Sequence, residues 1–310
     1  MSLPFTITAA AIFLWSILSV VSRVLLLNFH LDPWFFSFMQ LFSGGIILLV
    51  MGGKHTFSLA SFRLPFTWII GMLRVLSAAL YTAALVWISV LEAGTIGTFA
   101  VPLIAIALWL FHGKQPSYGE WTGHIVITGA IIALFFHIEN TVAYEVLWLM
   151  VSNALCLVLI SILAERHPDN ISDEPGARFR FTGSVLLVTA SFFLLLKLGQ
   201  GGATAPFLDW QSISISVAVG VTLRAPSMVF AFWSIRLVGA QNYLAAIALL
   251  PFAGMVLEQA AVAYGLLSSS RLQTETFVLA LVVAGGTLIV VFARSRANRR
   301  LSPDIPSTHR

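Results

Sequence analysis

The sequence predicts an all-α integral membrane protein with about ten transmembrane helices in two inverted five-helix repeats. The first observation is composition: 58% of the 310 residues are hydrophobic and 10% are charged, whereas a soluble domain carries about 25% charged residues. The second is the length of the apolar stretches, which match the roughly 20 residues that a helix needs to cross a bilayer. They lack the alternation of strands, so helices must satisfy the backbone. The third is a likeness between the two halves of the chain.

Ten apolar segments are expected to be the membrane helices. The first has no basic stretch ahead of it and no small-residue cleavage site after it, so it predicts a retained helix and not a signal peptide. A tight junction around Glu92 separates the third from the fourth, and the fifth and tenth are short. The predicted helices are Pro4–Leu27, Pro33–Met51, Thr67–Ser89, Gly94–Phe111, Trp121–Phe136, Val142–Leu163, Phe181–Leu198, Ile213–Ile235, Tyr243–Leu266 and Thr276–Ala293.

Charge placement predicts the orientation, because Lys and Arg collect in cytoplasmic loops. With ten crossings, twelve basic residues fall on the side that holds both termini, and only Lys197 and Arg271 fall on the other. We therefore expect a multi-pass protein of the cell (inner) membrane with both termini cytoplasmic. The same asymmetry explains the pI near 9.6. Because a soluble basic face is missing, the bilayer is an expected partner and nucleic acid is not.

The two halves of the chain show a weak internal repeat. Aligning Pro102 on Pro251 places a similar apolar run ahead of each proline and leaves Arg74 and Arg224 one residue out of register. Five helices are an odd number, so the second copy must enter the membrane from the opposite face, as in many secondary transporters. The predicted units are two repeats and a basic, disordered cytoplasmic tail, over residues 1–138, 139–293 and 294–310.

Three features of the sequence occur together: the two five-helix halves, the Leu14-Trp15-Ser16 step in the first helix, and the stretch from Ala84-Leu85 to Pro102. In these features the chain resembles the EamA-type permeases of the drug/metabolite transporter superfamily. Two positions differ from the common pattern: Gln40 stands about where the family often has arginine, and Gly113-Lys114-Gln115 replaces a Gly-Glu step. The resemblance implies a central cavity between the halves, alternating access by their rocking, and small metabolites as substrates.

Ionisable groups inside membrane helices are the first candidates for substrate binding, because a charge at the bilayer centre costs roughly 2.5–3.5 kcal/mol on insertion scales. Arg224 lies deepest, near the middle of its predicted helix, and its planar donors suit a carboxylate or phosphate. A purely structural role, in which Arg224 pairs with Glu258 or with helix carbonyls, explains this buried arginine equally well. Pro226 removes a helix hydrogen bond nearby, which favours an irregular helix that lines a cavity.

Three further charged residues complete this set. Arg74 and Arg23 lie nearer the ends of their helices, where a long side chain can reach water by snorkelling. Glu258 is a candidate partner for an arginine, or a carboxyl group that exchanges a proton during transport. The three arginines outnumber the one glutamate, so a substrate with a negative group is favoured: an amino acid, an organic anion or a phosphorylated metabolite.

Uncharged candidates for substrate binding are Trp15 and Tyr81, which lie towards the middle of their helices, and Gln40, which can hydrogen-bond a ligand or another helix. His124 and His137 are isolated, and Cys156 is the only cysteine. We therefore expect no metal site, no disulfide within the chain and no cofactor.

Secondary transport of a small metabolite is the favoured function, and proton coupling or exchange is open. A channel or membrane scaffold is the alternative, although no selectivity filter is recognisable. A membrane-embedded enzyme is a weaker alternative because no nucleophile or metal motif appears, so we expect no catalytic residues. A homodimer is left open.

Overall fold

The computed structural model describes residues 3–53, 60–136, 138, 140–174, 176–199, 209–267 and 274–301. These residues are almost entirely helical, and no strand occurs among them. The helices are α1 (Leu3–Asn28), α2 (Pro33–Met51), α3 (Ala60–Arg63), α4 (Pro65–Ala84), α5 (Val90–Gly97), α6 (Ala100–His112), α7 (Tyr118–Phe135), α8 (Asn140–Arg166), α9 (Pro168–Ile171), α10 (Ala177–Gly199), α11 (Trp210–Val219), the π-helix η1 (Gly220–Arg224), α12 (Ala225–Val238), α13 (Ala240–Ile247), α14 (Leu250–Ala263) and α15 (Thr274–Leu301).

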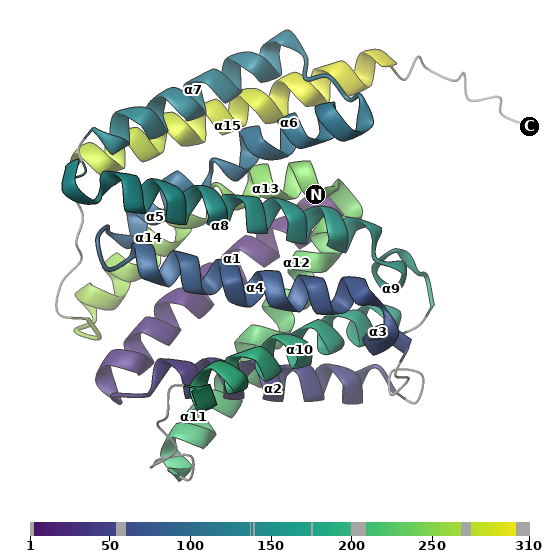
Figure 1. The fold of residues 1–310 in the computed structure, drawn as a ribbon, viewed down its shortest axis with the longest axis vertical. Coiled ribbons are helices and arrows are strands. Elements are labelled where there is room, and N and C mark those ends of the chain that lie inside the picture. The colour runs from purple at the N-terminus through teal and green to yellow at the C-terminus, as the bar shows by residue number, and fades with distance from the viewer. Residues whose placement is uncertain are drawn as a thin grey trace, which may run out of the picture.

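Within the described residues, nine helical runs are long and apolar enough to cross a membrane. They are α1, α2, α4, α8, α10, α15 and three runs that join α5 to α6, α11 to α12, and α13 to α14. The predicted segment Trp121–Phe136 does form a helix, α7, but Glu120 and His124 reduce its apolar character. Figure 1 shows that α7 lies alongside α15. The chain is thus a helical protein with several membrane-spanning candidates.

Side-chain caps fix the starts of α2 and α5. The Asp32 side chain accepts a hydrogen bond from the Phe35 backbone N–H (2.8 Å), and Pro33 occupies the first turn of α2, where proline's missing N–H costs nothing. At the tight junction around Glu92, Ser89 and Glu92 form a capping box, which begins α5. This box separates the third predicted segment from the fourth.

Three of the predicted helices are interrupted, and a proline follows each interruption. The fourth divides between α5 and α6, and the ninth between α13 and α14. The eighth contains η1. Pro102, Pro251 and Pro226 each lack the N–H that would bond to the carbonyl four residues earlier, so the regular helix loses a hydrogen bond at these places.

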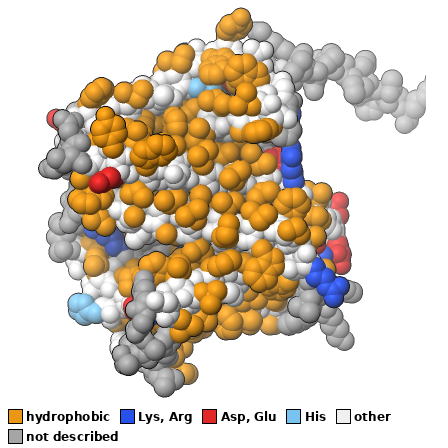
Figure 2. All heavy atoms as spheres, in the orientation of Figure 1, with side chains coloured by type: hydrophobic (Ala, Val, Ile, Leu, Met, Phe, Trp, Pro, Cys, Tyr) orange, Lys and Arg blue, Asp and Glu red, His pale blue; other side chains and the backbone are white. Residues whose placement is uncertain are grey.

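Helices from the two halves of the chain pack against one another. The main pairs are α2 with α10, α4 with α8, α7 with α15, and α1 with α12 and α14 (Figure 1). The largest buried cluster lies among α2, α4, α8, α10 and α12, and it includes Ile70, Phe181 and Phe232. Outside the core, Figure 2 shows a face covered mostly by hydrophobic side chains, with charged side chains towards its edges. That distribution suits a bundle surrounded by lipid.

The expected disordered tail is helical in its first part. Helix α15 continues to Leu301, eight residues beyond the predicted end at Ala293. The Arg294 Nε donates to Glu120 Oε1 of α7 (2.7 Å), and its Nη1 donates to Asn242 Oδ1 (2.6 Å). These bonds fix the extension to neighbouring helices. Residues 302–310 lie outside the described part of the chain.

Candidate functional site

Arg224 ends the π-helix η1, and the irregular helix expected near Pro226 is therefore present. The backbone N–H of Ala225 bonds to the Gly220 carbonyl, five residues back instead of four. Gly220 lies directly against α2: a Cβ built on it would stand 2.5 Å from the Gln40 carbonyl oxygen. The π-helical turn and this close crossing bring the Arg224 side chain against α2. Single π turns inside α-helices are frequent at functional sites.

Gln40 and Trp15 are the neighbours of the Arg224 guanidinium. The Arg224 Nε donates to Gln40 Oε1 (3.1 Å), and Gln40 is 2% exposed. The Arg224 Cζ lies 5.2 Å from the centroid of the Trp15 ring of α1, which is within the range of a cation–π contact. The amide oxygen and the indole both favour a cation here. Neither carries a negative charge that would neutralise it.

Arg74 of α4 approaches the same indole. Its Cζ lies 5.8 Å from the Trp15 ring centroid, and Tyr243 of α13 lies close to it. The Arg74 Nε is buried without a hydrogen-bond partner among the described residues, and so is the Trp15 Nε1. We call Trp15, Gln40, Arg74, Arg224 and Tyr243 the two-arginine cluster. Five helical elements of both halves contribute to it.

The remaining predicted site residues lie apart from this cluster. Arg23, two turns beyond Trp15 on α1, forms an ion pair and hydrogen bond with Glu258 of α14. Glu258 was predicted either to pair with an arginine or to exchange a proton. It does pair with an arginine, which is Arg23 and not Arg224. Tyr81 is half-buried on α4 and packs against a second core cluster around Ile127 and Leu134. Among the described residues, no hydrogen bond, ion pair or cation–π contact joins it to either arginine.

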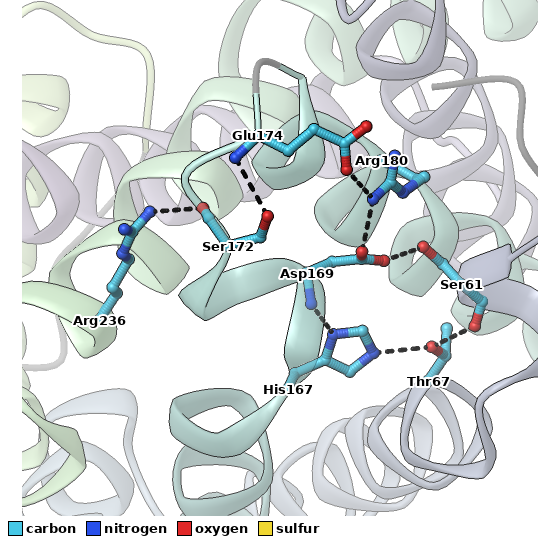
Figure 3. Close-up of polar contacts among 8 residues, drawn as sticks. All are labelled: Ser61, Thr67, His167, Asp169, Ser172, Glu174, Arg180 and Arg236. Atoms are coloured by element: carbon cyan, nitrogen blue, oxygen red, sulfur yellow. Dashed lines mark hydrogen bonds and ion pairs between the residues drawn. The ribbon is translucent and has the colours of Figure 1, made fainter. Parts of the chain in front are cut away.

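A second polar network, at the loop between α8 and α10, was not predicted. Figure 3 shows Asp169 between Arg180 and Ser61, and His167 between the Asp169 backbone and Thr67. The Arg180 Nη2 donates to Asp169 Oδ1 (2.6 Å), and the Ser61 hydroxyl also donates to Asp169. The sequence showed only a polar loop here. Nothing in its pattern distinguishes buried loop charges from solvated ones.

Burial and hydrogen bonding set the ionisation of this network. Burial acts to raise the pKa of Asp169, but the bonds from Arg180 and Ser61 outweigh it and hold that pKa below its usual value. Burial lowers the pKa of His167 to about 4, with Asp169 opposing the shift and Arg180 adding to it. The His167 Nδ1 accepts from the Asp169 backbone N–H (3.2 Å). The proton therefore belongs on Nε2, which faces Thr67 Oγ1 at 3.1 Å.

His167 should make the protein less stable in mild acid. Its pKa rises from about 4 in the folded state to the ordinary 6.5 on unfolding, so between these values the unfolded chain binds the extra proton. The contribution of neutral His167 to the free energy of unfolding is complete above pH 6.5, and it falls by up to ~1.4 kcal/mol per pH unit towards pH 4. Thermal unfolding in detergent at pH 7.5 and pH 5 should show a smaller loss for His167→Gln than for the unaltered protein. Equal losses would contradict this assignment.

No metal site is formed by the described residues: no group of three or more His, Cys, Asp or Glu side chains is placed to hold an ion. His124 lies on α7 in ring contact with Trp121 and close to the Arg294–Glu120 pair, and both of its ring nitrogens are buried without a hydrogen-bond partner in the described part of the chain. Cys156 is a buried free thiol within the main core cluster.

Comparison with known proteins shows the fold but no family. No family model matches the chain, and no curated protein matches it. A solved structure described only as "Crystal structure of protein" is similar to it, with a TM-score of 0.64 and 18% sequence identity. The similarity covers 94% of this chain and 99% of that one. At such an identity the likeness concerns the architecture alone, so the resemblance to EamA-type permeases stays a prediction.

Proposed function

We propose that this protein is a secondary transporter that moves a small metabolite with a negative group across a membrane. The observation that carries the proposal is the pair of arginines, Arg74 and Arg224, that share the Trp15 ring with no carboxylate in ion-pair distance among the described residues. Uncompensated charge inside an apolar bundle is costly. An anionic substrate would supply the missing partner.

The helix pairing supports two inverted five-helix repeats within ten crossings. If α1 corresponds to α8 and α4 to the run from α11 to α12, the pair α4–α8 maps onto the pair α12–α1. The pairs α2–α10 and α7–α15 map onto themselves. This scheme counts α7 as a crossing. Arg74 and Arg224 then occupy related positions, as the alignment of Pro102 with Pro251 predicts, and α1 begins and α15 ends towards the same side in Figure 1. That side would be cytoplasmic by the charge distribution.

Polar links between the halves at both ends of the bundle support alternating access. At one end Lys197 Nζ bonds to Asp32 Oδ2 (2.7 Å). At the other, Asp169 and His167 contact Ser61 and Thr67. When the halves separate at a water-exposed end, these polar groups can hydrogen-bond to water in place of each other. Opening one set while the other holds would expose the cluster to one side at a time.

A channel or scaffold remains the second candidate class, but no observation favours it. A membrane-embedded enzyme likewise has no support from the described side chains, since the cluster contains cations, an amide and aromatic rings but no nucleophile beside a base.

Uptake into proteoliposomes tests the proposal. Labelled amino acids, dicarboxylates, sugar phosphates and a quaternary ammonium compound would be offered to vesicles with the unaltered protein. We expect saturable uptake of an anionic solute, reduced at least tenfold by Arg224→Gln because the anion loses its partner. The control is the double variant Arg23→Gln/Glu258→Gln, which removes an ion pair without leaving an unpaired charge. Saturable uptake of the ammonium compound with no response to anions would overturn the proposal.

A further inference from the structure

The two-arginine cluster has an excess of hydrogen-bond donors. An arginine carries five N–H donors and no acceptor. Of those on Arg224, only Nε has an acceptor among the described residues, Gln40 Oε1. The buried Arg74 Nε and Trp15 Nε1 have none there. A ligand that satisfies this cluster must therefore offer several acceptor oxygens.

The charge of the cluster is also incompletely matched. Arg74 and Arg224 lie close enough to repel one another, and both lie over one indole, at 5.8 and 5.2 Å. Other carboxylates of the helical bundle form ion pairs with other arginines: Glu258 with Arg23, Glu120 with Arg294, and Asp169 with Arg180. A ligand with one negative charge would leave one arginine uncompensated in a low-dielectric interior, whereas a ligand with two would neutralise both.

We propose that the cluster binds a small dianion, either a short dicarboxylate or a phosphate monoester, held by Arg74 and Arg224 together. This inference rests on the proposed function and specifies the substrate of the same site. Each guanidinium presents a planar edge that can bind two oxygens at once. Because both approach the same indole, one small ligand can reach the two of them. Gln40 holds Arg224 in place, and Trp15 supports both cations from one ring.

Matched pairs of anions test the charge requirement directly. Binding to the purified protein in detergent would be measured by calorimetry for succinate against butyrate, and for methyl phosphate against dimethyl phosphate. Within each pair the size is similar and the charge differs. We expect at least one dianion to bind at least tenfold more tightly than its monoanionic partner. Equal affinities within both pairs, or no binding of any of the four, would overturn the inference.

The pH dependence distinguishes the two kinds of dianion. The second ionisation of a phosphate monoester has a pKa of about 6. If methyl phosphate is the better ligand, its affinity should rise several-fold between pH 5.5 and 7.5, while that of succinate changes less over this range. A flat profile for bound methyl phosphate would mean that the monoanion suffices, which contradicts the proposal.

Arginine variants locate the site. Arg74→Gln and Arg224→Gln should each reduce the affinity for the dianion at least tenfold and remove the preference over the monoanion. Arg23→Gln/Glu258→Gln should keep both. If a single variant fails to fold, the comparison of the four anions on the unaltered protein still decides the charge requirement. Binding is measured without vesicles, so the two proposals can fail separately. Binding of a dianion without uptake would contradict the transporter proposal alone. Uptake with equal affinities for dianion and monoanion would contradict the dianion proposal alone.

Discussion

Replacing Arg180 by glutamine is expected to lower the free energy of unfolding by about 3–5 kcal/mol, because it leaves the Asp169 carboxylate buried without its cation. Arg180 is 6% exposed and Asp169 is 8% exposed. The loss should appear as a large drop in the thermal midpoint in detergent. The Asp169→Asn/Arg180→Gln double variant should recover part of it, since both charges are then absent.

Asp173 provides the control for this prediction. It also pairs with an arginine, Arg236, but its side chain is 96% exposed. Asp173→Asn should change the stability by less than about 1 kcal/mol, because exposed ion pairs contribute little. If Arg180→Gln were as mild as Asp173→Asn, the buried network between α3, α9 and α10 would not be what holds this end of the bundle.

Replacing Gly220 by alanine is expected to weaken both stability and anion binding. The added Cβ would lie 2.5 Å from the Gln40 carbonyl oxygen and 2.9 Å from the Gln40 Cα, and neither backbone atom can rotate away. Helix α2 and η1 must separate, at a cost of about 1–3 kcal/mol from overpacking. The separation also moves Gln40 from Arg224, so we expect a further reduction of at least several-fold in affinity for the anion.

Gly129 is the matched control for Gly220. It lies within α7, and a Cβ there would meet nothing within 4 Å. Gly129→Ala should be neutral or stabilise the protein by up to about 1 kcal/mol through helix propensity. Both variants would be compared by thermal unfolding and by calorimetry. A Gly220→Ala protein that matches Gly129→Ala in both measurements would show that the α2 crossing does not position Arg224.

Hydrophobic length alone predicted most of the fold. The segment Pro33–Met51 coincides with α2, and the other predicted helices are found with their ends shifted by a few residues or more. The interruptions in three helices were harder to predict from the sequence. Pro226 indicated one of them, but the breaks before Pro102 and Pro251 depend on which carbonyls find other partners after packing. The helical extension of α15 depends on Glu120, which is far away in the sequence.

The sequence predicted the charged residues inside the membrane helices, but it did not predict which of them form ion pairs. A rule based on the cost of intramembrane charge selects Arg23, Arg74, Arg224 and Glu258 together. Which of these pair with each other is a matter of three-dimensional proximity, and only Arg23 meets Glu258. Tyr243 was not predicted as a site residue because it is one of many aromatic residues near helix ends. The Asp169 network was not predicted because charged residues in loops are usually solvated.

Counterflow in proteoliposomes tests whether Arg74 and Arg224 bind a substrate that is carried by alternating access. Vesicles would be loaded with an excess of the unlabelled anion that binds best, and labelled anion would be added outside at a low concentration. We expect a transient accumulation of label above its outside concentration, abolished by Arg224→Gln and kept by Arg23→Gln/Glu258→Gln. Equilibration without accumulation would indicate a channel, and no protein-dependent entry of label would show that the arginines do not serve transport.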